Sequence, residues 1–198
     1  LSAPVENCPK IDLATVSGQL SGNTDGYRGL VQAEGTWGSL DHMQLRSTII
    51  GGLWGIDFEA LRIDRGNGSA VAENARISWK NIFDWQGLFH FKNFDPSAFS
   101  DKLPGMVSAD FTSVGKVRDD FGVDVMFEVF NLGGRMWDQP ISASGNVAVT
   151  ENDLRTDGLE VRSGEVEGVA RIGKAMISWA DRLSWSGEIR LDNFDPSG

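Results

Sequence analysis

Residues 78–97 read SWKNIFDWQGLFHFKNFDPS, and residues 178–197 read SWADRLSWSGEIRLDNFDPS. Nine of the 20 aligned positions are identical, among them both tryptophans, the glycine and the run Asn-Phe-Asp-Pro-Ser. Average residue usage predicts about one match in fifteen positions for unrelated segments. The two segments are therefore copies of a repeat, and such a repeat indicates units that bury apolar surface against their neighbours.

The repeat extends upstream of these two segments. Leu61-Arg62-Ile63 aligns with Leu159-Glu160-Val161, at an offset close to that of the quoted segments. The offset changes gradually along the chain, as expected if insertions collect in loops. We therefore expect one continuous, elongated β domain of two units, residues 1–105 and residues 106–198, the second truncated at its C-terminal end. With no methionine at position 1, we expect a segment of a longer repeat protein.

The composition is that of a folded chain with an excess of acidic residues. Hydrophobic residues make up 40% of the chain and charged residues 23%, which disfavours disorder. The net charge of −10 argues against nucleic acid as a partner and against electrostatic docking on anionic headgroups. Cys8 is the single cysteine, which excludes an internal disulfide. No apolar run approaches the ~20 residues that span a bilayer.

Apolar and polar residues alternate with a period of two through most of the chain, which indicates half-buried β-strands. Val31, Ala33, Gly35 and Trp37 illustrate one such face. The sequence Gly66-Asn-Gly-Ser69 favours a hairpin turn, because Asn and Gly tolerate positive φ. We therefore predict an all-β fold of about six strands per unit, joined as an antiparallel meander.

One short segment breaks the strand pattern. Asp95 and Pro96 offer an N-cap and a first helical residue, and Leu103-Pro104-Gly105 ends the segment. The sequence therefore predicts a single helical turn between the two units.

Catalysis finds little support in the residue types and their spacing. His42 and His90 are far apart, each within a predicted strand, and Asp119-Asp120 has the character of a solvated loop. Asp57 and Glu59 share a strand face but have no further ligands at suitable spacing. No glycine-rich phosphate loop opens a helix. We therefore expect no catalytic residue, no metal site and no cofactor, and a protein that is not an enzyme.

The aromatic residues favour an apolar core or groove over a sugar-binding platform, because the repeated tryptophans lie in phase with aliphatic neighbours. We expect equivalent residues of the two copies to stack along the long axis with their side chains on one side of the sheet. A long apolar face must be buried by closure, by a second sheet or by something apolar that it holds. The candidates for an apolar groove are Trp79, Trp85, Phe89, Phe91, Val123, Val125, Phe127, Val129, Trp179, Trp185, Ile189 and Leu191.

The order of these motifs resembles the long β-repeat region of the TamB family, the inner-membrane-anchored subunits of the translocation and assembly module of diderm bacteria. The resemblance lies in Trp79 … Trp85-x-Gly-x-Phe-x-Phe-x-Asn-Phe-Asp-Pro96 … Leu103-Pro-Gly-x-Val-Ser108. Ser17-Gly-x-Leu-x-Gly22, Tyr27-x-Gly29 and Leu61-x-Ile63 precede it in the same order, so the resemblance covers nearly the whole chain.

The resemblance implies an open β-taco trough with an apolar interior. It also implies a periplasmic segment of a full-length protein whose inner-membrane anchor, an N-terminal helix, is absent here. The implied function is conduction of phospholipid acyl chains between the inner and outer membranes. Other parts of the full-length chain would meet an outer-membrane TamA-like barrel protein. One alternative is a scaffold that assists assembly of outer-membrane β-barrel proteins or autotransporters by strand pairing. The other is a carbohydrate-binding β-domain that uses the tryptophans.

Overall fold

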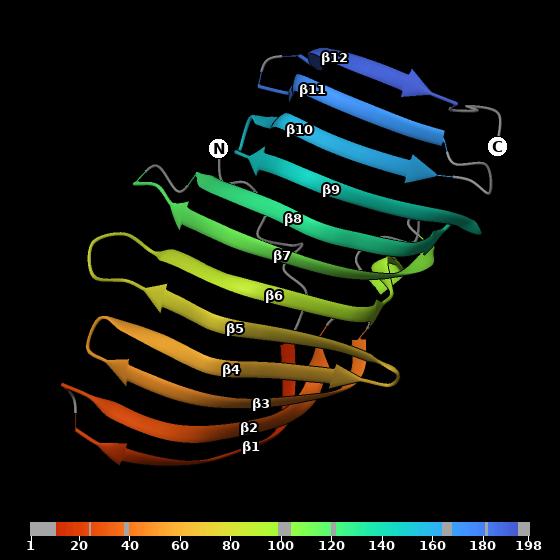
Figure 1. Ribbon diagram of the computed structural model, residues 1–198. Helices are drawn as coiled ribbons and strands as arrows, with labels where there is room; N and C mark the ends of the chain where they lie inside the picture. The colour runs from red at the N-terminus through yellow and green to blue at the C-terminus, as the bar shows by residue number, and fades with distance from the viewer. Residues whose placement is uncertain are drawn as a thin grey trace.

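The computed structural model describes residues 11–23, 25–37, 40–98, 104–119, 122–163, 168–180 and 182–193. They form one antiparallel sheet of twelve strands that follow one another in sequence order (Figure 1). The elements are β1 (Ile11–Gly22), β2 (Tyr27–Trp37), β3 (Leu40–Gly52), β4 (Gly55–Arg65), β5 (Gly68–Ser78), β6 (Asp84–Phe94), the 3-10 helix η1 (Pro96–Ala98), β7 (Gly105–Val117), β8 (Val123–Met136), β9 (Gln139–Val149), β10 (Asp153–Ser163), β11 (Gly168–Ser178) and β12 (Ser184–Asp192).

The predicted fold class is confirmed, because every strand pairs only with its neighbours in the sequence. Among the described strands β1 and β12 do not pair with each other, so the sheet stays open. Strand β6 pairs with β7 across residue 105, which makes the sheet continuous there. The division into two units at that residue remains a prediction.

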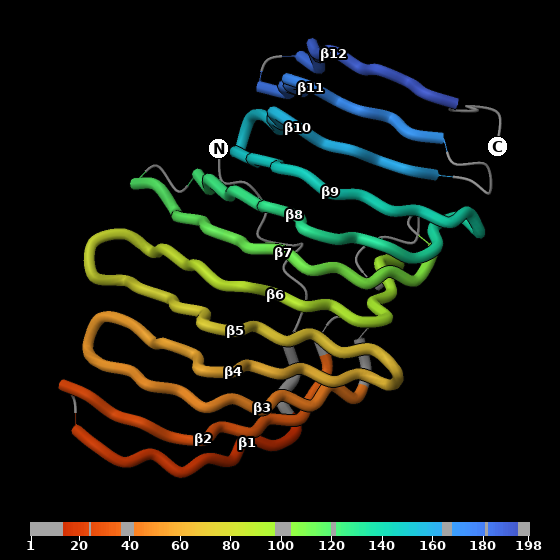
Figure 2. Tube along the Cα trace, in the orientation of Figure 1, coloured from red at the N-terminus to blue at the C-terminus, as the bar shows by residue number. Residues whose placement is uncertain are grey.

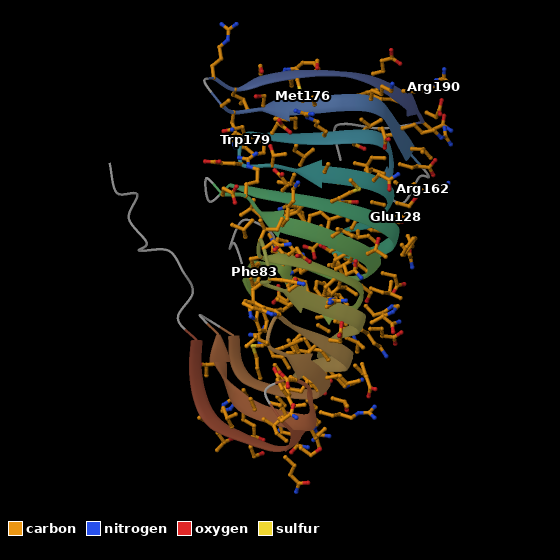
Figure 3. The ribbon with its side chains drawn as sticks, turned by 90° about the vertical axis from the view of Figure 1, so that its left-hand side faces the viewer. Phe83, Glu128, Arg162, Met176, Trp179 and Arg190 are labelled. Carbon is orange, nitrogen blue, oxygen red and sulfur yellow. The ribbon has the colours of Figure 1, made fainter. Side chains whose placement is uncertain are left out.

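The sheet has two faces of opposite character. We call the face that carries Phe89 and Phe111, which are cross-strand partners, the inner face. The outer face carries His90 and Asp110, which are paired beside them. In Figures 1 and 2 the right-hand ends of β1 to β3 turn behind the sheet, so the sheet is a curved trough. Figure 3 shows Glu128, Arg162 and Arg190 of the outer face on one side of this trough.

Residues inserted into the middle of several strands account for the curvature. An extra residue in one strand of a pair bends that strand and increases its twist. The register shifts at Glu59 in β4, at Asn74 in β5 and at Phe130 in β8. It shifts again within β10 between Arg155 and Gly158, and within β11 between Ile172 and Ala175. These positions lie near the strand midpoints, so the bend runs along the length of the sheet.

The bulges also explain the glycine that both copies of the repeat share. A Cβ atom placed on Gly87 would lie 2.9 Å from the Cβ atom of Ala75, on the bulged strand β5. A Cβ atom on Gly187 would lie 2.6 Å from that of Ala175, on the bulged strand β11. Both distances are shorter than ordinary carbon contacts of about 3.5–4.0 Å. Only glycine fits at these two positions without displacing the neighbouring strand.

The shared asparagine has a conformational role. Asn93 and Asn193 both have a φ of 49°, a left-handed conformation that asparagine tolerates better than most residues. Downstream of Asn93, Asp95 accepts a hydrogen bond of 2.9 Å from the Ser97 amide and caps η1. The predicted helical turn is thus present at residues 96–98, and residues 99–103 lie outside the described part. The predicted hairpin turn at Gly66-Asn67 is also present, with a φ of 53° at Gly66.

Packing in the described chain is shallow. No described side chain has an exposed fraction below 2%, and the buried apolar residues are mostly alanines, such as Ala72, Ala75 and Ala109. A sealed core of this chain length normally encloses large side chains completely. The single curved layer therefore packs its inner side chains against one another and leaves them without a covering layer.

Candidate functional site

The inner face carries two continuous rows of cross-strand partners, with one residue from each of the twelve strands. The first row is Gly18, Val31, Ser47, Leu61, Ala72, Phe89, Phe111, Val129, Gly145, Leu159, Ile172 and Ile189. The second row is Val16, Ala33, Leu45, Ile63, Ala70, Phe91, Ala109, Leu132, Ala143, Val161, Ala170 and Leu191. We call them the inner rows, and neither contains a charged residue.

Strand spacing fixes the length of the inner rows. Neighbouring strands lie about 4.8 Å apart, so twelve strands give rows about 50 Å long. Small and large residues alternate in the second row from Ala70 to Leu191, which lets large side chains lie over small ones on a concave surface. The inner face is therefore an uninterrupted apolar strip that runs across all the strands.

Phenylalanines are concentrated at the middle of this strip. The ring of Phe111 stacks on that of Phe89 at 5.3 Å and meets the ring of Phe91 edge-on at 5.3 Å. Phe127 of β8 continues the cluster, with its ring centre 5.9 Å from that of Phe111. Contacts of this geometry add about 0.5–1.5 kcal/mol per pair beyond simple burial. The cluster therefore stiffens the floor of the trough across β6, β7 and β8.

Charged residues gather on the outer face and pair with one another there. Side-chain hydrogen bonds from Arg62 hold the pKa of Asp64 below its ordinary value. Hydrogen bonds from Arg162, and then from Arg171, lower the pKa of Glu160 in the same way. His90 Nδ1 lies 2.7 Å from Asp110 Oδ1. The charges of these pairs thus lie on the face opposite the inner rows.

The inner face is most exposed at its two ends. On β12 the exposed fractions are 77% for Trp185, 56% for Ile189 and 55% for Leu191, and on β1 they are 62% for Val16 and 63% for Leu20. Apolar side chains so exposed lose the free energy of burial, about 25 cal/mol per Å². Each of these two strands has a neighbour on one side only among the described strands, which leaves its inner side chains uncovered.

The structure brings most of the predicted groove residues together. Phe89, Val129 and Ile189 lie in the first inner row, and Phe91 and Leu191 lie in the second. By the same cross-strand pairing Trp85, Val123, Val125, Phe127 and Trp185 also belong to the inner face.

Trp79 and Trp179 lie elsewhere, in the loops that follow β5 and β11. The Trp79 indole donates a hydrogen bond of 3.0 Å to the Leu53 carbonyl, and its backbone N–H donates one of 3.0 Å to the Trp54 carbonyl. The Trp179 indole donates to the Glu151 carbonyl at 2.6 Å. Each tryptophan thus links its loop to the preceding turn on the same edge of the sheet, between β3 and β4 for Trp79 and between β9 and β10 for Trp179.

Sequence reasoning missed Phe111, which lies at the centre of the phenylalanine cluster. The period-two pattern of β7 is hidden because Met106 and Val114, on the outer face, are as apolar as the inner residues. The available signal was the repeat itself, because Ser17-Gly-Gln-Leu20 lines up loosely with Ser108-Ala-Asp-Phe111 of the second unit.

Sequence reasoning also missed an apolar row on the outer face. Four of its five cross-strand partners are apolar, and the row is Val114, Met126, Ala148, Arg155 and Met176. A hollow of about 630 Å³ lies beside it, lined in part by Met126, Ala148 and Met176. Methionines on exposed strand positions give no periodic signal when the opposite face is apolar as well.

The described residues include no helix with the length and apolar character that a bilayer span needs. They also contain no group of three or more His, Cys, Asp or Glu side chains placed to hold a metal ion.

The chain belongs to the TamB family. The model of the TamB N-terminal domain matches residues 1–171, which is most of the chain. No curated protein and no solved structure matches the chain. The predicted family is confirmed, and with it membership of a family of transport and assembly proteins of the cell envelope.

Proposed function

We propose that the trough holds phospholipid acyl chains, and that the chain is a periplasmic segment that conducts them between the inner and outer membranes. The inner rows carry this proposal. They are about 50 Å long, whereas the acyl chains of one bilayer leaflet extend over about 15 Å, half of the hydrocarbon thickness. Several lipids can therefore lie along the strip one after another, with their headgroups in water.

The energetics agree with a conduit. Each CH₂ group moved from water onto an apolar surface contributes about 0.8 kcal/mol. Because neither row contains a charge or a gap between strands, an acyl chain that slides along the rows keeps nearly the same contacts at each step. The open face lets the headgroup move with it, so no polar group has to cross an apolar barrier.

A second candidate function is strand pairing with client proteins. Among the described strands β12 has a neighbour on one side only, and all nine of its residues are exposed. An unpaired edge offers backbone N–H and C=O groups to an extended partner. In this case the edge, and not the inner rows, would carry the function.

Site-specific photocrosslinking in the full-length protein in cells tests the first proposal. A photoreactive phenylalanine analogue at position 127 projects from the inner face, and the same analogue at position 126 projects from the outer face. We expect phospholipid adducts, detected by mass spectrometry, at position 127 and few at position 126. Protein adducts at β12 positions combined with no lipid at position 127 would favour the scaffold.

A further inference from the structure

Two loops on the same edge of the sheet share an unusual combination of residues. We call residues 79–83 the Trp79 loop and residues 179–183, of which 181 is not described, the Trp179 loop. They connect β5 to β6 and β11 to β12, at the left-hand edge of the sheet in Figure 1. Both begin with tryptophan and carry a second large apolar residue four positions later, Phe83 in one loop and Leu183 in the other.

These loops are held in place and still expose apolar surface. The tryptophan hydrogen bonds fasten each loop to the turn that precedes it. The exposed fraction is 39% for Trp79 and 45% for Phe83 in the first loop, and 44% for Trp179 and 77% for Leu183 in the second. Loop tips in water are normally polar. Apolar residues fixed at such tips therefore point to an apolar ligand at this edge.

The apolar tips continue the inner face. The ring of Phe83 lies 6.2 Å from that of Trp85, which is an inner-face residue of β6. Leu183 is two residues before Trp185, the equivalent inner-face residue of β12. In Figure 3, Phe83 and Trp179 lie on the side away from Glu128, Arg162 and Arg190. A chain that lies on the inner face therefore meets these loops where it leaves the trough.

Each loop also carries an exposed cation with no acidic partner in the described part of the chain. Lys80 follows Trp79, and Arg182 precedes Leu183. Strand cations of the outer face are often paired, as Arg28 is with Glu59 and Arg76 with Asp57. An indole, an aliphatic or aromatic tip and a free cation together form the arrangement that suits the boundary between lipid tails and headgroups.

The opposite edge lacks this combination among its described turns. Gly66 and Asn67 form one turn there, and Asp95 caps η1 in the next connection. Trp137 provides an exposed aromatic residue on that edge, but Asp138 follows it. The two edges of the trough are therefore chemically different.

We propose that the Trp79 and Trp179 loops bind the phosphate of a phospholipid whose acyl chains lie on the inner face, with Lys80 and Arg182 as the phosphate ligands. This inference rests on the proposed function. It adds that headgroups move along one edge of the trough. The two loops, which are six strands apart, are then successive binding sites for them. The net charge of −10 opposes long-range attraction of anions, so recognition here depends on direct contact between each cation and a phosphate.

Binding of two fluorescent lipids to the full-length protein tests this assignment. Phosphatidylethanolamine and diacylglycerol are compared with the same acyl chains and with the fluorophore on one of them. The double variant Lys80→Gln/Arg182→Gln is compared with Lys92→Gln/Arg190→Gln, which removes the same charge from the outer faces of β6 and β12. We expect the loop variant to bind phosphatidylethanolamine about fivefold more weakly for each cation lost, and diacylglycerol as before. We expect the outer-face variant to bind both as the natural protein does.

The outcomes separate this inference from the proposed function. If the natural protein binds neither lipid, both fail. If it binds both but the loop variant loses nothing, or no more than the outer-face variant, the phosphate assignment alone fails. Inorganic phosphate is the third probe, measured by competition. If it displaces phosphatidylethanolamine and leaves diacylglycerol bound, the loops select a free anion and the lipid assignment is overturned.

Discussion

Trp79 and Trp179 show how one residue type serves two purposes in this chain. They occupy equivalent positions in the two copies of the repeat. Each lies an even number of residues before an inner-face tryptophan, yet each belongs to a loop. Their indole N–H groups reach backbone carbonyls of a neighbouring turn that is more than 20 residues earlier in the sequence. They hold adjacent hairpins together at the edge, where no strand pairing is available.

Replacing Trp79 with phenylalanine removes the indole donor and keeps an aromatic ring. The Leu53 carbonyl then loses its hydrogen bond. We expect the free energy of unfolding to fall by about 0.5–1.5 kcal/mol, measured by urea denaturation. Trp54→Phe is the matched control, because Trp54 is 50% exposed in the adjacent turn and its indole donates no described hydrogen bond. Equal losses in the two variants would show that ring size, and not the hydrogen bond, stabilises the edge.

Residue-level prediction succeeded where alternation was clean and failed where a strand ended. Phe89, Phe91 and Phe127 were assigned to an apolar face because apolar residues recur at every second position around them. Trp79 was grouped with them because it continues the same period of two. Strand β5 ends at Ser78, however, and the period does not fix the direction of a side chain beyond the end of a strand. Phe111 went unnoticed because its strand is apolar on both faces near Val114. Pattern reading detects a contrast between faces, so it fails where that contrast is weak.

At the scale of single strands, the bulges decide both the curvature and the facing of residues. In β8, Val129 and Leu132 both lie on the inner face, although they are three residues apart. Phe130 and Asn131 together oppose the single residue Ser144, and this one extra residue returns Leu132 to the inner face. A strict period of two cannot anticipate this shift, because nothing in the sequence of β8 distinguishes an inserted residue from its neighbours. The strands could be predicted from the sequence, but the bend could not.

The fit of Gly87 against the bulged strand β5 can be tested with a rescue. Gly87→Ala forces a methyl group against Ala75, and overpacking of this kind costs about 1–3 kcal/mol of unfolding free energy. We expect Ala75→Gly to recover part of that loss in the double variant, measured as a coupling energy from denaturation of all four proteins. Gly133→Ala serves as the control, because nothing lies within 4 Å of the added atom, and we expect a change within about 0.5 kcal/mol. Strictly additive losses would disprove the contact.

At the scale of the whole molecule, the main question is whether the inner face is open. A charge placed in a sealed core is buried without a partner and costs several kcal/mol, whereas a charge on an open trough reaches water. The described structure has no layer over Phe127 and no fully buried side chain. The two arrangements therefore predict different behaviour for the same substitution.

We expect Phe127→Glu to unfold cooperatively, with a loss of about 0.5–1.5 kcal/mol from the missing ring contact with Phe111. We also expect it to abolish lipid-dependent growth or transport, because the carboxylate interrupts the apolar path. Met126→Glu, one residue away on the exposed outer face, is the control, and we expect it to retain function. Circular dichroism during thermal unfolding reports the fold, and complementation in cells reports the function. Unfolding of Phe127→Glu would mean a sealed core, and full function in a folded variant would mean that the inner face is not the path.

The strand order has a consequence for how the chain reaches this structure. Because each strand pairs only with the strands before and after it, nearly all tertiary contacts join strands that are consecutive in the sequence. Low contact order of this kind favours rapid folding, and stacked hairpins add to an existing sheet one at a time. A growing edge is then always present, and each new hairpin has a template to pair with. The chain can accordingly fold progressively from one end while the rest of it is still extended, and the trough lengthens by one wall segment with every strand that arrives.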